Sequence, residues 1–147
     1  MSSPGIVTNV SSTVRRAGIA PARVRDLVER TLRSEKIKNA MVSVAFVGRG
    51  AIAAINWKYL RHKGATDVIS FGMGRDAPGM PAVGDIYICP DVARQNARRN
   101  NVPLRQELAR LVVHGALHVA GHDHPTDDTR TQSPMWKKQE RILATAD

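Results

Sequence analysis

The chain has one cysteine, no long apolar run and few acidic residues, and each scarcity limits the class of protein. Cys89 cannot form an internal disulfide, which fits a reducing compartment, and the strand-like residues before it favour a small buried hydrophobic residue over a reactive thiol. No apolar run approaches the ~20 residues that a membrane span requires. The amino-terminal sequence MSSPGIVTNV lacks a charged region followed by an apolar one. We therefore expect a soluble, cytoplasmic protein without a membrane partner.

The scarcity of acidic residues leaves the chain strongly basic. It has 22 Lys and Arg against 13 Asp and Glu, a net charge of +9 and a pI near 10.6. Such a field favours a polyanionic partner such as RNA. A solvated basic surface with no specific partner would give the same composition.

Repeats, low-complexity tracts and internal linkers are also absent. At 147 residues and 42% hydrophobic composition, the chain is long enough to bury roughly two-thirds of the surface of its unfolded form. We expect a single domain over residues 1–147.

Hydrophobic periodicity predicts a mixture of helices and strands that do not strictly alternate. We therefore expect an α+β fold, in which helices cover a small mixed four-stranded sheet and a metal site lies on a long central helix and the turn after it. The expected segments are extended residues 6–10, strands 41–47, 66–71 and 84–89, and helices 21–35, 51–60, 90–99, 103–120 and 134–144, with Gly64 ending the second helix and Ser133 capping the last.

Four of the five histidines lie in HGALHVAGHDH, residues 114–124. His114 and His118 are four residues apart, so on a helix they share one face and can reach one ion at the ~2.0–2.1 Å that zinc prefers. Gly121 is suited to end the helix in a left-handed conformation, which would bring His124 toward the same ion. Three ligands leave one tetrahedral position open, as in catalytic rather than structural zinc sites. The sequence thus predicts one Zn²⁺ per chain, with nickel or copper as competitors in vitro.

The alternative for any histidine pair at this spacing is an accident of packing or surface placement. Two further residues lie in the same turn. Asp123 could accept a hydrogen bond from a ligand imidazole. His122 could carry a proton or simply face solvent.

The spacing matches the zinc-protease motif HExxHxxGxxH except that Gly115 replaces the glutamate. That glutamate takes a proton from metal-activated water, so its absence argues against conventional peptide hydrolysis. We expect the glycine to leave space above the metal. With the basic charge, this space favours a large anionic substrate and phosphodiester hydrolysis.

The chain resembles the YbeY-type endoribonucleases, also described as ribosomal RNA maturation factors. HGALHVAGHDH is similar to their HGxLHLxGyDH, with Val119 and His122 as mild variants. INWKYLRHKGATDVISF (55–71) resembles LNxxYRxxxxPTDVLSF, and VGDIYICPDVARQNA (83–97) resembles LGDIvIcpevaxxqA. RQELARLVVHG and the closing helix with Glu140 also fit, so the resemblance covers roughly residues 40–145.

The resemblance implies a metal-dependent, single-strand-specific endoribonuclease that acts in small-subunit (16S) ribosomal RNA 3′-end maturation and ribosome quality control. It implies a small mixed sheet with surrounding helices and a zinc-like ion on His114, His118 and His124. The implied partners are ribosomal RNA and the small ribosomal subunit, and contacts with an assembly GTPase and ribosomal proteins could follow.

One departure concerns catalysis. The arginine that follows tyrosine in the family motif is Leu60 here, and the proline before TDV is Ala65. Arg61 or His62 could replace that arginine, although one residue along a helix turns a side chain by about 100°. The general base is therefore open, with Asp123, His122 and Arg61 as candidates.

Other polar residues have two interpretations each. Arg94 and Arg98 share a helix face and, with Arg61, are candidates for RNA contact, although such a face is usually only solvated. Thr66 and Asp67 could form a turn or touch substrate. The remaining residues with this ambiguity are Asn56, Ser70, Asp85, Arg99, Arg105 and Arg110.

Two other functions are compatible with the sequence. The chain could be a non-catalytic ribosome assembly factor whose metal is structural, which the Leu60 departure favours. It could also be another zinc hydrolase, such as a metallopeptidase, which Gly115 disfavours.

Overall fold

The computed structural model describes residues 5–73, 80–122 and 133–146. The predicted four strands and the predicted helices are present, with most boundaries within a few residues of the prediction. The strands are β1 (Ile6–Ser12), β2 (Ala40–Phe46), β3 (Val68–Gly72) and β4 (Ala82–Ile88), and the helices are α1 (Pro21–Ser34), α2 (Arg49–Ile55), the π-helix η1 (Asn56–Leu60), α3 (Pro90–Asn100), α4 (Leu104–Val119) and α5 (Pro134–Thr145).

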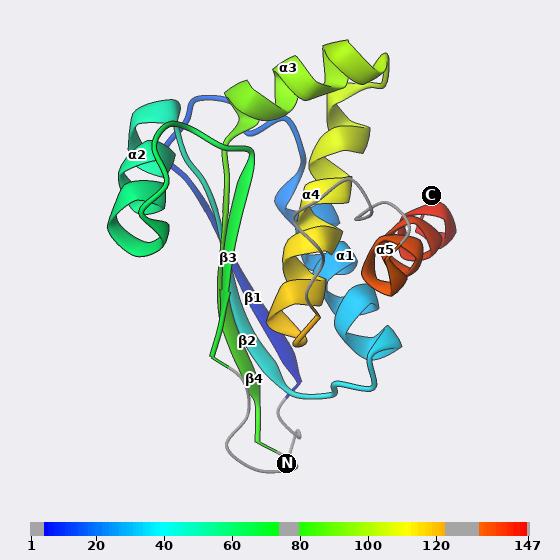
Figure 1. The fold of residues 1–147 in the computed structure, drawn as a ribbon. Helices are drawn as coiled ribbons and strands as arrows, with labels where there is room; N and C mark the ends of the chain where they lie inside the picture. Colours follow the sequence, from blue (N-terminus) through cyan, green and yellow to red (C-terminus); the bar gives the residue numbers. More distant parts are fainter. Residues whose placement is uncertain (1–4, 74–79, 123–132, 147) are drawn as a thin grey trace.

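The strands form one mixed sheet in the order β1-β2-β4-β3, which confirms the predicted architecture. β1 and β4 both pair with β2 in parallel, whereas β3 pairs with β4 antiparallel. Parallel neighbours need a crossover connection, and α1 supplies it between β1 and β2. α1, α4 and α5 lie on one face of the sheet and α2 lies on the other (Figure 1).

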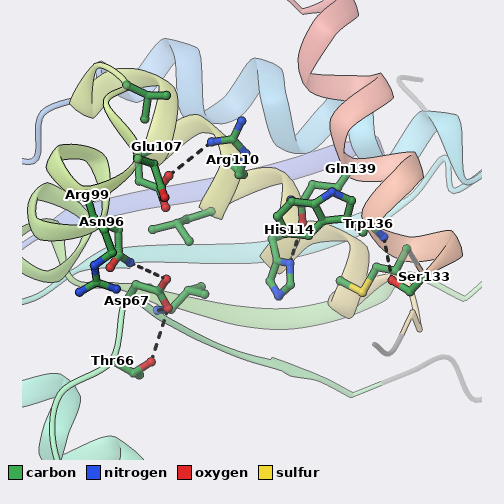
Figure 2. Close-up of a pocket in the computed structure, with 15 residues that line it drawn as sticks. Thr66, Asp67, Asn96, Arg99, Glu107, Arg110, His114, Ser133, Trp136 and Gln139 are labelled. Carbon is green, nitrogen blue, oxygen red and sulfur yellow. Dashed lines mark hydrogen bonds and ion pairs between the residues drawn. The ribbon is translucent and has the colours of Figure 1, made fainter. Parts of the chain in front are cut away.

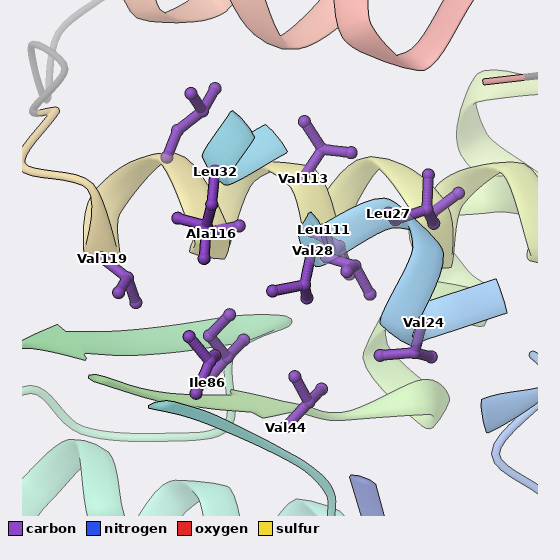
Figure 3. Close-up of a cluster of buried hydrophobic side chains, with 14 of the residues drawn as sticks. Val24, Leu27, Val28, Leu32, Val44, Ile86, Leu111, Val113, Ala116 and Val119 are labelled. Carbon is purple, nitrogen blue, oxygen red and sulfur yellow. The ribbon is translucent and has the colours of Figure 1, made fainter. Parts of the chain in front are cut away.

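The main core lies between the sheet and α4, which packs against α1, α3, α5, β3 and β4. Strand alternation directs Val42, Val44 and Phe46 to this side, as predicted. Helical periodicity does the same for α1, whose Leu27 and Leu32 are fully buried beside α4 (Figure 3). Each such side chain contributes roughly 1.5–3 kcal/mol on burial. α4 is therefore held firmly enough to present side chains at fixed positions.

A smaller cluster lies under α2 on the other face of the sheet and comprises Val47, Ile52, Ile69 and Cys89. Cys89 is fully buried, which confirms its interpretation as a small hydrophobic residue.

The second predicted helix differs from expectation in two ways. Its last turn widens into the π-helix η1, which shifts the side-chain register, so Ile52 is buried while Tyr59 is 58% exposed. The helix ends at Leu60, and Arg61 adopts a left-handed conformation with φ 56°. The prediction that Gly64 ends this helix is therefore wrong, because the left-handed residue comes three positions earlier.

The predicted ends at Gly121 and Ser133 are confirmed. Gly121 has φ 106°, and its amide donates to the carbonyl of His118 at 2.9 Å, so the chain turns immediately after α4. The Ser133 hydroxyl accepts a hydrogen bond from the Trp136 amide at 3.1 Å and caps α5. Within the three described ranges, no helix is both long and apolar enough to cross a membrane.

Candidate metal centre and the adjoining pocket

His114 and His118 lie on the last two turns of α4, as their spacing predicts. Their ring centroids are 4.8 Å apart, and the rings meet edge to face at 73°. This separation is compatible with both imidazoles reaching one ion. His124 and Asp123 lie outside the described residues, and the residues inside contain no group of three side chains that could hold a metal.

The orientation of the His114 ring is set by α5. Its Nδ1 lies 2.7 Å from Oε1 of Gln139, a side chain that is only 1% exposed. Histidine ligands to metals usually hydrogen-bond through the nitrogen that does not face the ion. Because Nδ1 of His114 contacts Gln139, its other ring nitrogen, Nε2, is the one suited to bind a metal.

The turn after α4 is fixed by a second set of contacts. The His122 amide donates to the Leu117 carbonyl at 3.0 Å, and its Nε2 contacts Oε1 of Glu35 at the end of α1. Lys138 of α5 reaches the other carboxylate oxygen at 2.6 Å. Burial acts to raise the pKa of Glu35, but hydrogen bonds from Lys138 and His122 hold it below its ordinary value. The His122 ring is thus directed toward α1.

Gly115 has a packing role that the sequence did not reveal. A Cβ at this position would lie 2.8 Å from Cγ2 of Ile86 on β4. The expectation that Gly115 leaves space above the metal is therefore wrong, because the missing side chain makes room for the sheet. A glutamate here would force α4 away from β4.

His114 opens onto a pocket of about 640 Å³ between β3, α3, α4 and α5 (Figure 2). His118 lines a separate hollow of about 320 Å³ at the end of α4. The polar side chains that line the larger pocket are Thr66, Asp67, Asn96, Arg99, Asn100, Glu107, Arg110, His114, Ser133, Trp136 and Gln139.

Asp67 organises the far end of this pocket. Its Oδ1 accepts from the Val68 amide at 2.8 Å and from the Thr66 hydroxyl at 3.4 Å. Its Oδ2 accepts from Nδ2 of Asn96, on α3, at 3.1 Å. Thr66 and Asp67 thus form local hydrogen bonds before β3 and also line the pocket, while their contact with substrate stays a prediction.

The wall between these ends is an ion-pair network that was not predicted from the sequence. Nε and Nη2 of Arg110 donate to the two oxygens of Glu140 at 3.0 Å each, and Nη1 donates to Glu107 at 3.3 Å. Burial raises the pKa of Glu107 despite the opposing charge of Arg110. Burial also acts to raise the pKa of Glu140, but hydrogen bonds from Arg110 and Gln139 hold it below its ordinary value. The sequence signal that could have revealed this network is the spacing of residues 107, 110 and 114, which places them on one face of a helix.

None of the three predicted RNA-contact residues lines this pocket. Arg94 pairs with Asp91 at 2.9 Å, Arg98 is exposed on α3, and the Arg61 guanidinium lies 5.6 Å from the Trp57 ring centroid. Arg99, one residue from Arg98, does line it. Asp85 accepts from the Ser43 hydroxyl across β2 and β4, among the side chains that point away from α4.

Fold and site together define an α+β protein in which a long buried helix presents two histidines beside a polar pocket. The family model described as endoribonuclease YbeY matches residues 9–147, so the chain belongs to the YbeY family.

Individual relatives agree with this assignment. An endoribonuclease YbeY from Syntrophus aciditrophicus is 32% identical over 124 residues, covering 82% of this chain and 78% of that protein. One from Staphylococcus aureus strain JH9 is 37% identical over 130 residues, covering 82% and 83%. The solution structure of TM1509 from Thermotoga maritima aligns with a TM-score of 0.63 and 27% identity over 95% of this chain and 89% of that one. The family resemblance drawn from the sequence motifs is confirmed.

Proposed function

We propose that the chain is a metal-dependent, single-strand-specific endoribonuclease that acts in 16S ribosomal RNA 3′-end maturation and ribosome quality control. The observation that carries this proposal is the histidine pair of α4, with His114 opening onto a polar pocket of about 640 Å³ in a chain of net charge +9. The names of the relatives support RNA as the substrate.

The pocket suits part of an RNA strand. Its volume lies within the roughly 300–1,000 Å³ of typical ligand pockets and exceeds what an ion alone requires. Arg99 and the Asn96 amide lie at the end that is remote from His114, where they can bind phosphate or a base edge. Because His114 is partly buried between α4 and α5, an unpaired strand would reach it more readily than a rigid duplex.

The proposed cofactor is one Zn²⁺ per chain, held by His114, His118 and His124. When bound, such an ion supplies charge stabilisation and activates water for attack on a phosphodiester. His114 and His118 act as ligands, Gln139 orients His114, and Arg99 binds the strand. The candidate bases are Asp123, His122 and Arg61; His122 contacts Glu35 and Arg61 lies over the Trp57 ring, and an Asp123→Asn substitution tests the first candidate.

The proposed partners are ribosomal RNA and the small ribosomal subunit in the cytoplasm, with contacts to an assembly GTPase and ribosomal proteins. Support for these finer assignments is the family membership alone.

The deciding experiment combines metal analysis with RNA cleavage. Purified wild-type protein should contain about one zinc per chain and cleave single-stranded ribosomal RNA precursor faster than a duplex of the same sequence. His118→Ala should lose both metal and cleavage. Gln95→Ala, which changes an exposed residue of α3 outside the pocket, should keep both. Undiminished cleavage by metal-free His118→Ala protein would contradict the proposal.

The presence of Leu60 in place of the family arginine favours one alternative function, a non-catalytic assembly factor with a structural metal. Contacts of Glu35 with His122 and Lys138 hold the described part of the turn through protein groups, which supports a catalytic ion. Chelation should therefore abolish cleavage while the protein stays folded, with its melting temperature lowered only by the lost free energy of metal binding. Loss of folding on chelation would favour the alternative.

A further inference from the structure

We propose that Gln139 is a positioning residue that sets the tautomer of His114, so that Nε2 carries the lone pair that a metal requires. The inference deepens the proposed metal site and rests on it for its functional meaning. Its evidence is a chain of hydrogen bonds in which each group has a fixed role as donor or acceptor.

The first link is the contact between α4 and α5. Nδ1 of His114 lies 2.7 Å from Oε1 of Gln139 (Figure 2). An amide oxygen can only accept a hydrogen bond, so a neutral imidazole must place its proton on Nδ1. The lone pair then lies on Nε2.

This argument requires that the Gln139 amide presents its oxygen, rather than its nitrogen, to His114. The second link provides that requirement, because Nε2 of Gln139 donates to Oε2 of Glu140 at 3.0 Å. An ionised carboxylate accepts only, so reversing the amide would place two acceptors together at Glu140.

The third link keeps Glu140 in the accepting role. Nε and Nη2 of Arg110 engage both of its oxygens in a two-pronged ion pair at 3.0 Å each. Such pairs fix the carboxylate plane as well as its charge. Glu107, which is 5% exposed, receives Nη1 of the same guanidinium at 3.3 Å and restrains it from the other side.

Arg110 can only donate hydrogen bonds, so it determines which group donates and which accepts along the relay, the chain of hydrogen bonds from Arg110 through Glu140 and Gln139 to His114. Gln139 is 1% exposed, so water cannot readily replace the contact once it is lost. Histidine in water favours the opposite tautomer, with its proton on Nε2, and the relay must overcome that preference before a metal binds.

The test measures the tautomer and the metal affinity separately. Gln139→Met keeps the length and apolar bulk of the side chain but removes the hydrogen bond. In metal-free wild-type protein, ¹⁵N NMR should show the His114 proton on Nδ1, and in Gln139→Met a substantial population should carry it on Nε2. Zn²⁺ affinity, measured by competition with a chelating dye, should fall by about 10–100-fold.

Two further variants make the result interpretable. Gln95→Met changes an exposed glutamine on α3 and should alter neither quantity. Glu140→Gln leaves Gln139 in place but allows its amide to turn, because a glutamine can donate as well as accept. It should shift the tautomer population and weaken zinc binding by a smaller factor, and it decides the question if Gln139→Met does not fold.

Wild-type tautomer populations in folded Gln139→Met, or in Glu140→Gln if only that variant folds, would overturn the inference. So would zinc affinity within about twofold of wild type. A wild-type protein that shows the predicted tautomer and its loss in the variants, yet cleaves no RNA, would refute the proposed activity and leave this inference standing.

Discussion

At the scale of single residues, Gly115 lacks a side chain because α4 packs closely against the sheet at this position. It is buried on α4, and Cγ2, Cγ1 and Cδ1 of Ile86 occupy the space where its Cβ would lie. The close approach of α4 to β4 therefore depends on this glycine.

Gly115→Ala should destabilise the protein by about 1–2 kcal/mol, because overpacking of ~1–3 kcal/mol exceeds the gain in helix propensity of up to ~1 kcal/mol. Gly50→Ala is the matched control. Gly50 lies on α2, and a Cβ added to it would meet no atom within 4 Å, so alanine should stabilise the protein by about 0.5–1 kcal/mol. Urea denaturation measures both.

A double-mutant cycle identifies the cause. In an Ile86→Ala background the clash is removed, so Gly115→Ala should no longer destabilise. If Gly115→Ala behaved like Gly50→Ala in the wild-type background, the packing role would be refuted.

At the scale of elements, Glu35 joins three segments that are distant in sequence. It lies at the end of α1, contacts His122 after α4 and binds Lys138 of α5. This ion-pair cluster therefore holds His122, the last described residue after α4, to α1 and α5.

Glu35→Ala should lower the free energy of unfolding by about 1–3 kcal/mol, because it leaves Lys138 and His122 without their carboxylate. This cost is smaller than that for a fully buried pair because the Lys138 side chain is 36% exposed to solvent. Glu29→Ala breaks an exposed pair with Arg33 on the same helix and should cost at most about 0.5 kcal/mol. Equal effects of the two substitutions would show that the cluster has no special role.

The difference in unfolding free energy between wild type and Glu35→Ala should depend on pH, because the pKa of Glu35 is lowered in the folded protein. Its folded pKa lies below the ordinary 4.5, so the unfolded chain binds its proton first as the pH falls. The stabilisation is present above pH 4.5 and is lost as the pH falls through the folded value. Denaturation midpoints of wild type and Glu35→Ala should therefore converge on acidification, and a gap that stayed constant would contradict this.

At the scale of the whole molecule, the net charge of +9 is a property that no single site explains. Several arginines are already paired with carboxylates, including Arg30 with Asp26 on α1 and Arg110 with Glu140. Arg99 instead lines the pocket, where its charge can meet a phosphate.

Binding of single-stranded RNA should weaken steeply with salt, because phosphate contacts release counterions. Arg99→Gln should reduce the slope of log affinity against log salt by about 0.7–1 and weaken binding of all sequences similarly. Arg30→Gln, which removes the same charge from α1, should change the slope much less. Fluorescence anisotropy at a series of salt concentrations measures both, and equal slopes for the two variants would exclude a phosphate contact by Arg99.

The sequence by itself determined the elements and the histidine pair. Helical and strand periodicities are local, so the buried faces of α1, β2 and α4 follow from the spacing of residues such as Leu27, Val44 and Leu117. The same local geometry places His114 beside His118. Four ordered motifs also sufficed to recognise the family.

Only the tertiary structure decided what surrounds those histidines. Gln139 reaches His114 from α5, Glu35 reaches His122 from α1, and Ile86 accounts for Gly115. These contacts join residues that are 25 to 87 positions apart, and no local period encodes which side chains meet when helices pack. For the same reason periodicity grouped Arg94 with Arg98, whereas the packing of α3 against α4 placed Arg99 at the pocket.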